Sequence, residues 1–107
     1  MSAQKIITGI ISLGAFISLA PSAKATVCVI WDPGDTSANV RYSPNGRYQS
    51  TLMNGTQVEV VGYRYDNQGR SWASIVQRGG AGNSFVFGKF VRDCIPGSLT
   101  PDGRIVR

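Results

Sequence analysis

From residue 27 onward, short runs rich in β-branched and aromatic residues alternate with clusters of turn-forming residues. In the longest run, Val58 and Val60 fall on the face of an extended segment opposite Glu59. No part of this region repeats with the 3.6-residue period of an amphipathic helix. Five or six short antiparallel strands at this spacing predict an all-β fold, a small barrel or a sandwich. The runs cover residues 27–31, 38–41, 49–53, 56–65, 71–77 and 84–87, with a last short run at 92–94.

Turn-forming residues separate these runs. Asn54-Gly55 is a tight-turn signal, because both residue types tolerate positive φ. Asp32, Asp35 and Asp66 stand in turn sequences, where aspartate is favoured for hydrogen bonds to its own backbone. Further turns are expected at 43–46 and at the glycine-rich segment 79–83. These signals predict one domain over residues 26–94, and the Pro-Gly and Pro-Asp-Gly sequences beyond it predict an irregular tail over 95–107.

The first 25 residues follow a different pattern. Lys5 precedes an uncharged, apolar or small-residue stretch over 6–20, a Pro-Ser pair interrupts it, and Ala23-Lys24-Ala25 supplies a small-x-small cleavage site. This order is typical of a secretory signal peptide cleaved after Ala25. The apolar stretch of 15 residues is shorter than the roughly 20 that a spanning helix needs. We therefore expect a secreted or periplasmic protein without a stable membrane anchor, and an uncleaved anchor is the less favoured alternative.

Composition limits the chemistry that the chain can perform. It has no histidine and two cysteines, which removes the commonest general base and most sets of metal ligands. We expect no metal, no cofactor and no enzymatic activity, since a hydrolase would have to use carboxylates or Lys89 as its base. Lys5 and Lys24 lie in the signal segment, so residues 26–107 carry nine basic and six acidic residues, a net charge of +3. The arginines form no run, which argues against a nucleic-acid partner.

Export would make the two cysteines a structural pair. Cys28 opens the patterned region and Cys94 closes it, and two cysteines in a small exported domain normally form a disulfide. A redox-active pair would favour Cys-x-x-Cys spacing, which is absent from the sequence. The bond would close a loop of 66 residues. By restricting the unfolded chain, it would add about 4 kcal/mol to the free energy of unfolding in the chain-entropy model.

Four pieces of the sequence carry short motifs in a fixed order. An Asn-Val-Arg motif is followed by a small residue and proline, then come a Leu-x-x-Gly-x-x-Val-x-Val motif, a Trp-x-x-aliphatic motif, and a closing aromatic-Val with an aromatic–aliphatic pair. The pieces stand at 39–44, 52–60, 72–75 and 85–91. Together they resemble a bacterial SH3-like domain, although that family usually has leucine at Ala38 and tryptophan at Phe85.

The resemblance implies a small, strongly bent SH3-like barrel of five to six antiparallel strands. It also implies a binding role toward cell-wall peptidoglycan or peptides, as a free-standing module, and we expect a monomer. The alternative is a protein-interaction or inhibitor module that docks on an exported partner protein.

Aromatic residues around the predicted loops are the candidate binding residues. Tyr42 and Tyr48 flank the loop that contains Asn45, and the three could form one wall of a groove. Tyr63 and Tyr65 share a strand face with Val61, which is either a binding stripe or a surface packed under a loop. Two further residues each have two interpretations. Trp72 is either a stacking platform or, as we favour, a core residue, and Arg41 either binds a carboxylate or, as we favour, bonds loop carbonyls.

Overall fold

A computed structural model describes residues 25–76 and 83–107 of the chain. All but the last residue of the expected signal peptide, and all but Asn83 of the glycine-rich turn, lie outside these ranges. The described part is all-β, as predicted. Its elements are β1 (Thr26–Ile30), β2 (Ser37–Arg41), β3 (Tyr48–Met53), β4 (Gln57–Tyr65), β5 (Ser71–Val76), β6 (Phe85–Phe87), a 3₁₀ turn η3 (Gly88–Phe90), β7 (Val91–Pro96), β8 (Ser98–Leu99) and β9 (Ile105–Val106).

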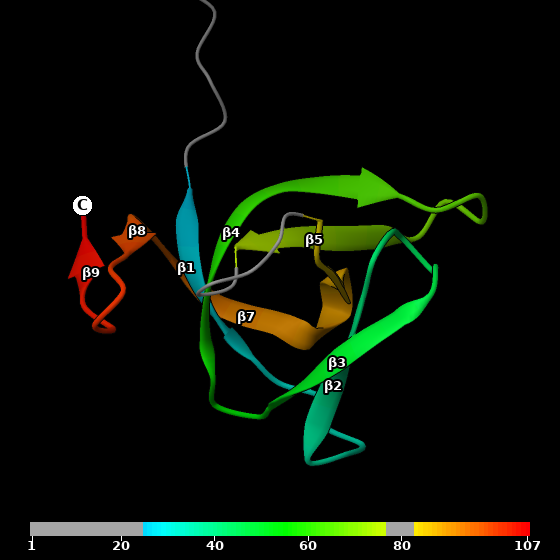
Figure 1. Ribbon diagram of the computed structural model, residues 1–107, viewed down its shortest axis with the longest axis horizontal. Helices are drawn as coiled ribbons and strands as arrows, with labels where there is room; N and C mark the ends of the chain where they lie inside the picture. Colours follow the sequence, from blue (N-terminus) through cyan, green and yellow to red (C-terminus); the bar gives the residue numbers. More distant parts are fainter. Residues whose placement is uncertain (1–24, 77–82) are drawn as a thin grey trace, which may run out of the picture.

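Seven strands form one antiparallel sheet in the order β3-β2-β6-β5-β4-β1-β7. Figure 1 shows that this sheet is strongly curled. The expected closed barrel is wrong, because the outermost strands β3 and β7 do not pair with each other in the described part of the chain. The described residues also contain more strands than the five or six expected. The short run at 92–94 is part of a full strand, β7, and a second sheet of two strands follows it.

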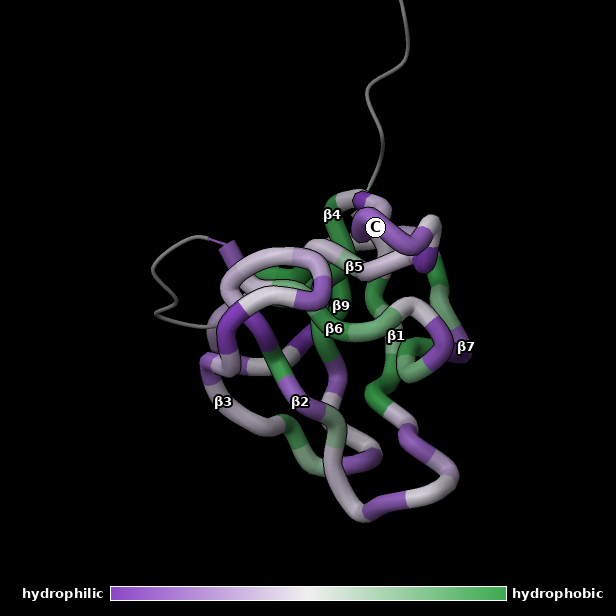
Figure 2. The backbone as a smooth tube through the Cα atoms, turned by 90° about the vertical axis from the view of Figure 1, so that its right-hand side faces the viewer, coloured by the Kyte–Doolittle hydropathy of each residue, from purple (hydrophilic) through white to green (hydrophobic). Residues whose placement is uncertain are grey.

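Alternation along the strands builds the core. Val58 and Val60 of β4 are both buried, as the pattern predicted, and Ala73 and Ile75 of β5 pack with them. Hydrophobic stretches of β1, β4 and β6 lie close together in Figure 2, with hydrophilic turns around them. The core cluster consists of Cys28, Ile30, Ala38, Val40, Val58, Val60, Ala73, Ile75 and Val86.

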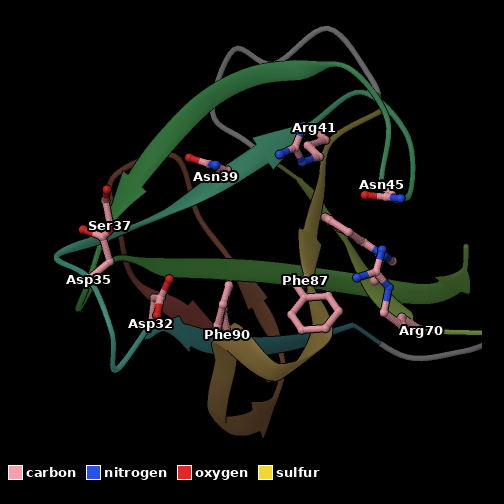
Figure 3. Close-up of a pocket in the computed structure, with 10 residues that line it drawn as sticks. Asp32, Asp35, Ser37, Asn39, Arg41, Asn45, Arg70, Phe87 and Phe90 are labelled. Carbon is pink, nitrogen blue, oxygen red and sulfur yellow. The ribbon is translucent and has the colours of Figure 1, made fainter. Parts of the chain in front are cut away.

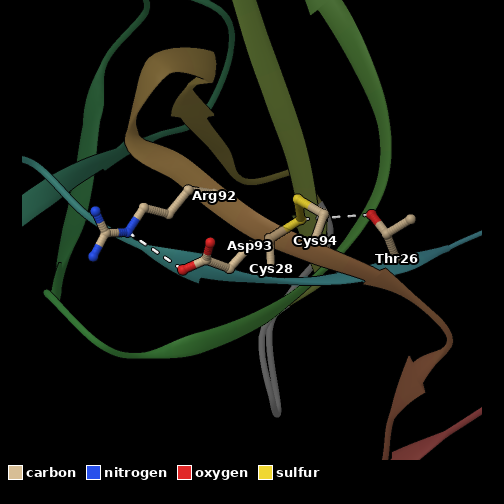
Figure 4. The surroundings of a disulfide bond; sticks show 5 residues. All are labelled: Thr26, Cys28, Arg92, Asp93 and Cys94. Atoms are coloured by element: carbon tan, nitrogen blue, oxygen red, sulfur yellow. Dashed lines mark hydrogen bonds and ion pairs between the residues drawn. A yellow bond between two sulfur atoms is a disulfide. The ribbon is translucent and has the colours of Figure 1, made fainter.

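The predicted disulfide between Cys28 and Cys94 is confirmed, and it joins β1 to β7 (Figure 4). Val27 pairs with Ile95 and Val29 with Arg92, so two residues of β7 stand opposite Cys28 alone. The first of the two, Asp93, has a φ of 54°, as the first residue of a β-bulge often does. The bulge brings the two cysteine Cα atoms to 4.1 Å, and the bond links a fully buried residue to an exposed one.

The sequence predicted an irregular tail over residues 95–107, but part of this segment forms strands. β7 continues to Pro96, and β8 and β9 then form a short hairpin through the pairs Ser98–Val106 and Leu99–Ile105. The Pro-Gly and Pro-Asp-Gly sequences are the turns of this structure, because Gly97 and Gly103 have φ values of 140° and 90°. The Leu99 amide donates a 2.8 Å hydrogen bond to Glu59 of β4, which attaches the hairpin to the main sheet.

Candidate functional site

A nearly buried carboxylate organises the hairpin between β4 and β5. The side chain of Asp66 is 1% exposed and accepts four hydrogen bonds of 2.9 Å. The donors are the amides of Gln68 and Arg70, Nε of Arg70 and the ring N–H of Trp72. Gly69 completes the turn with a φ of 77°.

These hydrogen bonds keep Asp66 ionised. Burial by itself raises the pKa of this carboxyl group, but the hydrogen bonds from Arg70, Trp72 and Gln68 together outweigh burial and lower the pKa from 3.8 to about 2. An ionised Asp66 holds both the guanidinium of Arg70 and the indole of Trp72, because the two groups donate to the same oxygen, Oδ2. Both of these side chains line a cleft.

Three aromatic rings form a row beside this hairpin. Trp72 pairs with Phe87 across strands β5 and β6, and their ring centroids are 5.3 Å apart in an edge-to-face arrangement. Phe87 contacts Phe90 of η3 in the same manner at 5.4 Å. Trp72 is buried, as favoured from the sequence, yet it lies outside the core cluster and packs in this row.

The aromatic row borders a cleft of about 260 Å³, called the first cleft here (Figure 3). Asp32, Asp35 and Ser37 lie at one end in Figure 3, Arg41, Asn45 and Arg70 lie toward the other, and Phe87 and Phe90 lie between them. The first cleft therefore has acidic groups at one end, basic groups at the other and apolar rings between. Its lining is Asp32, Asp35, Ser37, Asn39, Arg41, Asn45, Arg70, Trp72, Phe87 and Phe90.

The acidic end is held in place by a residue of a different turn. Asn54 accepts a 2.9 Å hydrogen bond from the Asp32 amide and donates to the carbonyls of Asp32 and Asp35 at 3.0 and 2.8 Å. The Asp32 carboxylate accepts the Gly34 amide, which is the turn bond expected of it. Neither Asp32 nor Asp35 forms an ion pair within residues 25–76 and 83–107.

The basic end is shaped by the loop between β2 and β3. Arg41 Nη1 donates a 2.8 Å hydrogen bond to the Gly46 carbonyl, so the favoured structural interpretation of Arg41 is confirmed. Arg41 nevertheless lines the first cleft. Asn45 has a φ of 52°, a left-handed conformation that asparagine tolerates better than most residues, and it also lines the first cleft.

A second cleft, of about 430 Å³, shares Arg70 and Phe87 with the first cleft. Tyr63 of β4 adds a further aromatic side chain to this cleft, and Lys89 of η3 adds a further cation. No acidic residue lines it among the residues that the structure describes. The full lining is Tyr63, Gly69, Arg70, Ser71, Phe87, Gly88 and Lys89.

The six sequence-predicted binding residues do not form one site. Asn45 and Trp72 line the first cleft and Tyr63 lines the second. The remaining three, Tyr42, Tyr48 and Tyr65, are exposed and line neither cleft.

Arginines cover several of the aromatic rings. Arg47 lies over Tyr42 at 4.4 Å from the ring centroid, so this face of Tyr42 is occupied. Arg92 covers a face of Trp31 in the same way at 4.3 Å. No such arginine contact involves Tyr63 in the described part of the chain, so its exposed ring remains available beside the second cleft.

The residues that complete the two clefts are not evident from the sequence. Phe87 and Phe90 belong to the closing aromatic segment of the SH3-like resemblance, which predicts part of the fold and indicates no binding residue. Arg70 and Lys89 gave no signal, because their importance depends on which strands become neighbours. Asp32 and Asp35 were correctly placed in turns, but nothing in the sequence indicated that both turns border a cleft.

Within the described residues, no group of three or more His, Cys, Asp or Glu side chains could hold a metal ion. In the same part of the chain, no helix has the length and apolar character needed to cross a membrane. No family model, no curated protein and no solved structure matches this chain.

Proposed function

We propose that this protein is an exported SH3-like binding module that recognises peptide-bearing fragments of cell-wall peptidoglycan. Support for export comes from the signal-like pattern of residues 1–25 and from the Cys28–Cys94 disulfide, a bond typical of oxidising compartments. Support for the SH3-like assignment comes from the four ordered motif pieces and the curled antiparallel sheet.

The observation that carries the proposal is the charge layout of the first cleft. A wall peptide presents amino and carboxyl groups along a short chain, and the cleft offers carboxylates at one end and guanidinium groups at the other. The rings of Phe87 and Phe90 between them supply apolar contact for the intervening groups. The polar side chains of Ser37, Asn39 and Asn45 add hydrogen-bonding capacity along the cleft.

Retention on purified peptidoglycan sacculi tests this function. The wild type should sediment with sacculi at physiological salt, and Asn39→Ala should sediment less, because Asn39 is exposed and lines the first cleft. Thr51→Ala is the matched control, since Thr51 is the cross-strand neighbour of Asn39 on β3 and lines neither cleft. Absence of wild-type retention, or equal loss in the two variants, would refute the proposal.

A second candidate function is docking on an exported protein. Tyr48 and Tyr65 are 53% and 71% exposed and line neither cleft, so they are available to a partner surface. Co-purification of a protein partner that is lost in Tyr65→Ser, with sacculus retention absent, would favour this function over the first.

A further inference from the structure

The two clefts share a wall. Arg70 and Phe87 line both, so the clefts adjoin at these two side chains. The 3₁₀ turn η3 forms the ridge between the clefts, because Phe87 and Phe90 line the first and Phe87, Gly88 and Lys89 line the second.

The ridge is held close to the sheet by Gly88. A Cβ atom at this position would lie 2.8 Å from the Ser71 carbonyl oxygen, so η3 and β5 approach more closely than any side chain there would allow. This approach fixes the backbone directly before Lys89. The second cleft is therefore a built feature of the sheet and η3, bordered by the Tyr63 ring of β4.

The second cleft contains a cation that forms no ion pair with the residues that the structure describes. Lys89 is exposed and forms no ion pair with the described residues, whereas Arg70, the other cation of this cleft, is bonded to Asp66 at 2.9 Å. No acidic residue among those described lines the cleft to repel an anion. Tyr63 and Phe87 line the same cleft as Lys89, and apolar walls strengthen the attraction between a cation and an anion held beside them.

We propose that the second cleft is a subsite for the terminal carboxylate of the bound peptide, with Lys89 as the cation that pairs with it. This inference rests on the proposed function, since it names the end of the wall peptide that the second cleft receives. The peptide would run from the acidic end of the first cleft, across Phe87 and Arg70, to Lys89. Tyr63 would contact the last side chain or backbone unit of the peptide and would not discriminate its terminal charge.

Two synthetic peptides that differ only at the carboxyl end test the subsite. The probes are L-alanyl-γ-D-glutamyl-L-lysyl-D-alanine as the free acid and as its C-terminal amide, titrated by calorimetry into the full exported protein. The wild type should bind the acid about tenfold more tightly than the amide, a typical effect of a partly desolvated charge pair. The difference should shrink as salt is added.

Variants separate the charge contact from the ring contact. Lys89→Gln should bind the acid as weakly as the wild type binds the amide, whereas Tyr63→Ala should weaken both peptides by a similar factor. Arg107→Gln removes the same charge from the chain end, away from both linings, and should leave both affinities unchanged. Circular dichroism on each variant confirms that the fold is retained.

The outcomes distinguish the two proposals. Equal binding of acid and amide by the wild type, or equal weakening of both by Lys89→Gln, would overturn the carboxylate subsite and leave the proposed function intact. Unchanged binding of both peptides by Tyr63→Ala would show that the second cleft is not occupied, which also overturns the subsite. No binding of either peptide, together with no retention on sacculi, would refute both proposals.

Discussion

Asp66 is the residue on which the site geometry most depends, although it lines neither cleft. A carboxylate that is 1% exposed is tolerated because four donors replace the water it has lost. Two of its donor residues, Arg70 and Trp72, line the first cleft, so one side chain sets the position of a cation and a ring. The sequence predicted the Asp66 turn but gave no indication that the carboxylate also reaches the Trp72 ring.

Asp66→Asn is expected to flatten the acid side of the stability curve. Because folding lowers the pKa of Asp66 from 3.8 to about 2, ionised Asp66 adds stability that is fully present above pH 3.8. This stability is lost as the pH falls through about 2. The free energy of unfolding of the wild type should therefore fall more steeply across this window than that of the variant, as measured by denaturant titration at closely spaced pH values.

Asp102 also titrates in the acid range, but it does not affect the difference between the wild type and the variant. Hydrogen bonding from the Thr100 hydroxyl lowers the pKa of Asp102, but Asp102 is present in both proteins and its contribution cancels. Parallel pH dependences in the wild type and Asp66→Asn would contradict the role assigned to Asp66.

At the scale of elements, the short connection between β6 and β7 does more than join two strands. It places Phe90 against the core and against Phe87, and it carries Lys89 on the ridge between the clefts. The sequence predicted a strand at 84–87 and a following aromatic–aliphatic pair, but gave no sign of the 3₁₀ turn. Such a turn is decided by the packing of the flanking strands, because three residues carry too little local preference of their own.

Gly88→Ala tests this packing. The added methyl group would meet the Ser71 carbonyl, a backbone atom that cannot rotate away, and we expect a loss of about 1–3 kcal/mol in the free energy of unfolding, as for other overpacked sites. Gly62→Ala is the matched control, since no atom of the described residues lies within 4 Å of a Cβ atom placed there. Denaturant unfolding of both variants gives the comparison, and an equally small effect in each would show that η3 is not held by this contact.

For the whole molecule, the disulfide links the first and last strands of the main sheet. β1 and β7 are the first and last strands of the seven-stranded sheet in sequence, and they pair beside each other at its edge. Cys28 and Cys94 lie 66 residues apart, so their bond removes a large amount of freedom from the unfolded chain. A domain of this size has a modest core, and the bond is therefore comparable to its whole expected stability.

Reduction of the Cys28–Cys94 bond should lower the melting temperature by about 15 °C or more. The estimate follows from about 4 kcal/mol for closing the loop and about 4 °C or more per kcal/mol in a small domain. Calorimetry with and without a phosphine reductant measures the shift, and free-thiol labelling confirms that the bond has opened. A melting temperature that is the same in both conditions would show that the bond adds no net stability.

The sequence by itself determined most strands and turns of residues 26–94 and the cysteine pair, but not the hairpin of β8 and β9. Alternation at Val58 and Val60, turn residues such as Asp66 and Gly69, and the placement of Cys28 and Cys94 are local signals, and local sterics and burial act on them directly. Only the tertiary structure decided that the sheet stays open and that the two clefts exist. The clefts combine side chains from the β1–β2, β2–β3 and β4–β5 connections, from the strands β2, β4, β5 and β6, and from η3. These segments become neighbours only once the strand order and registers are set.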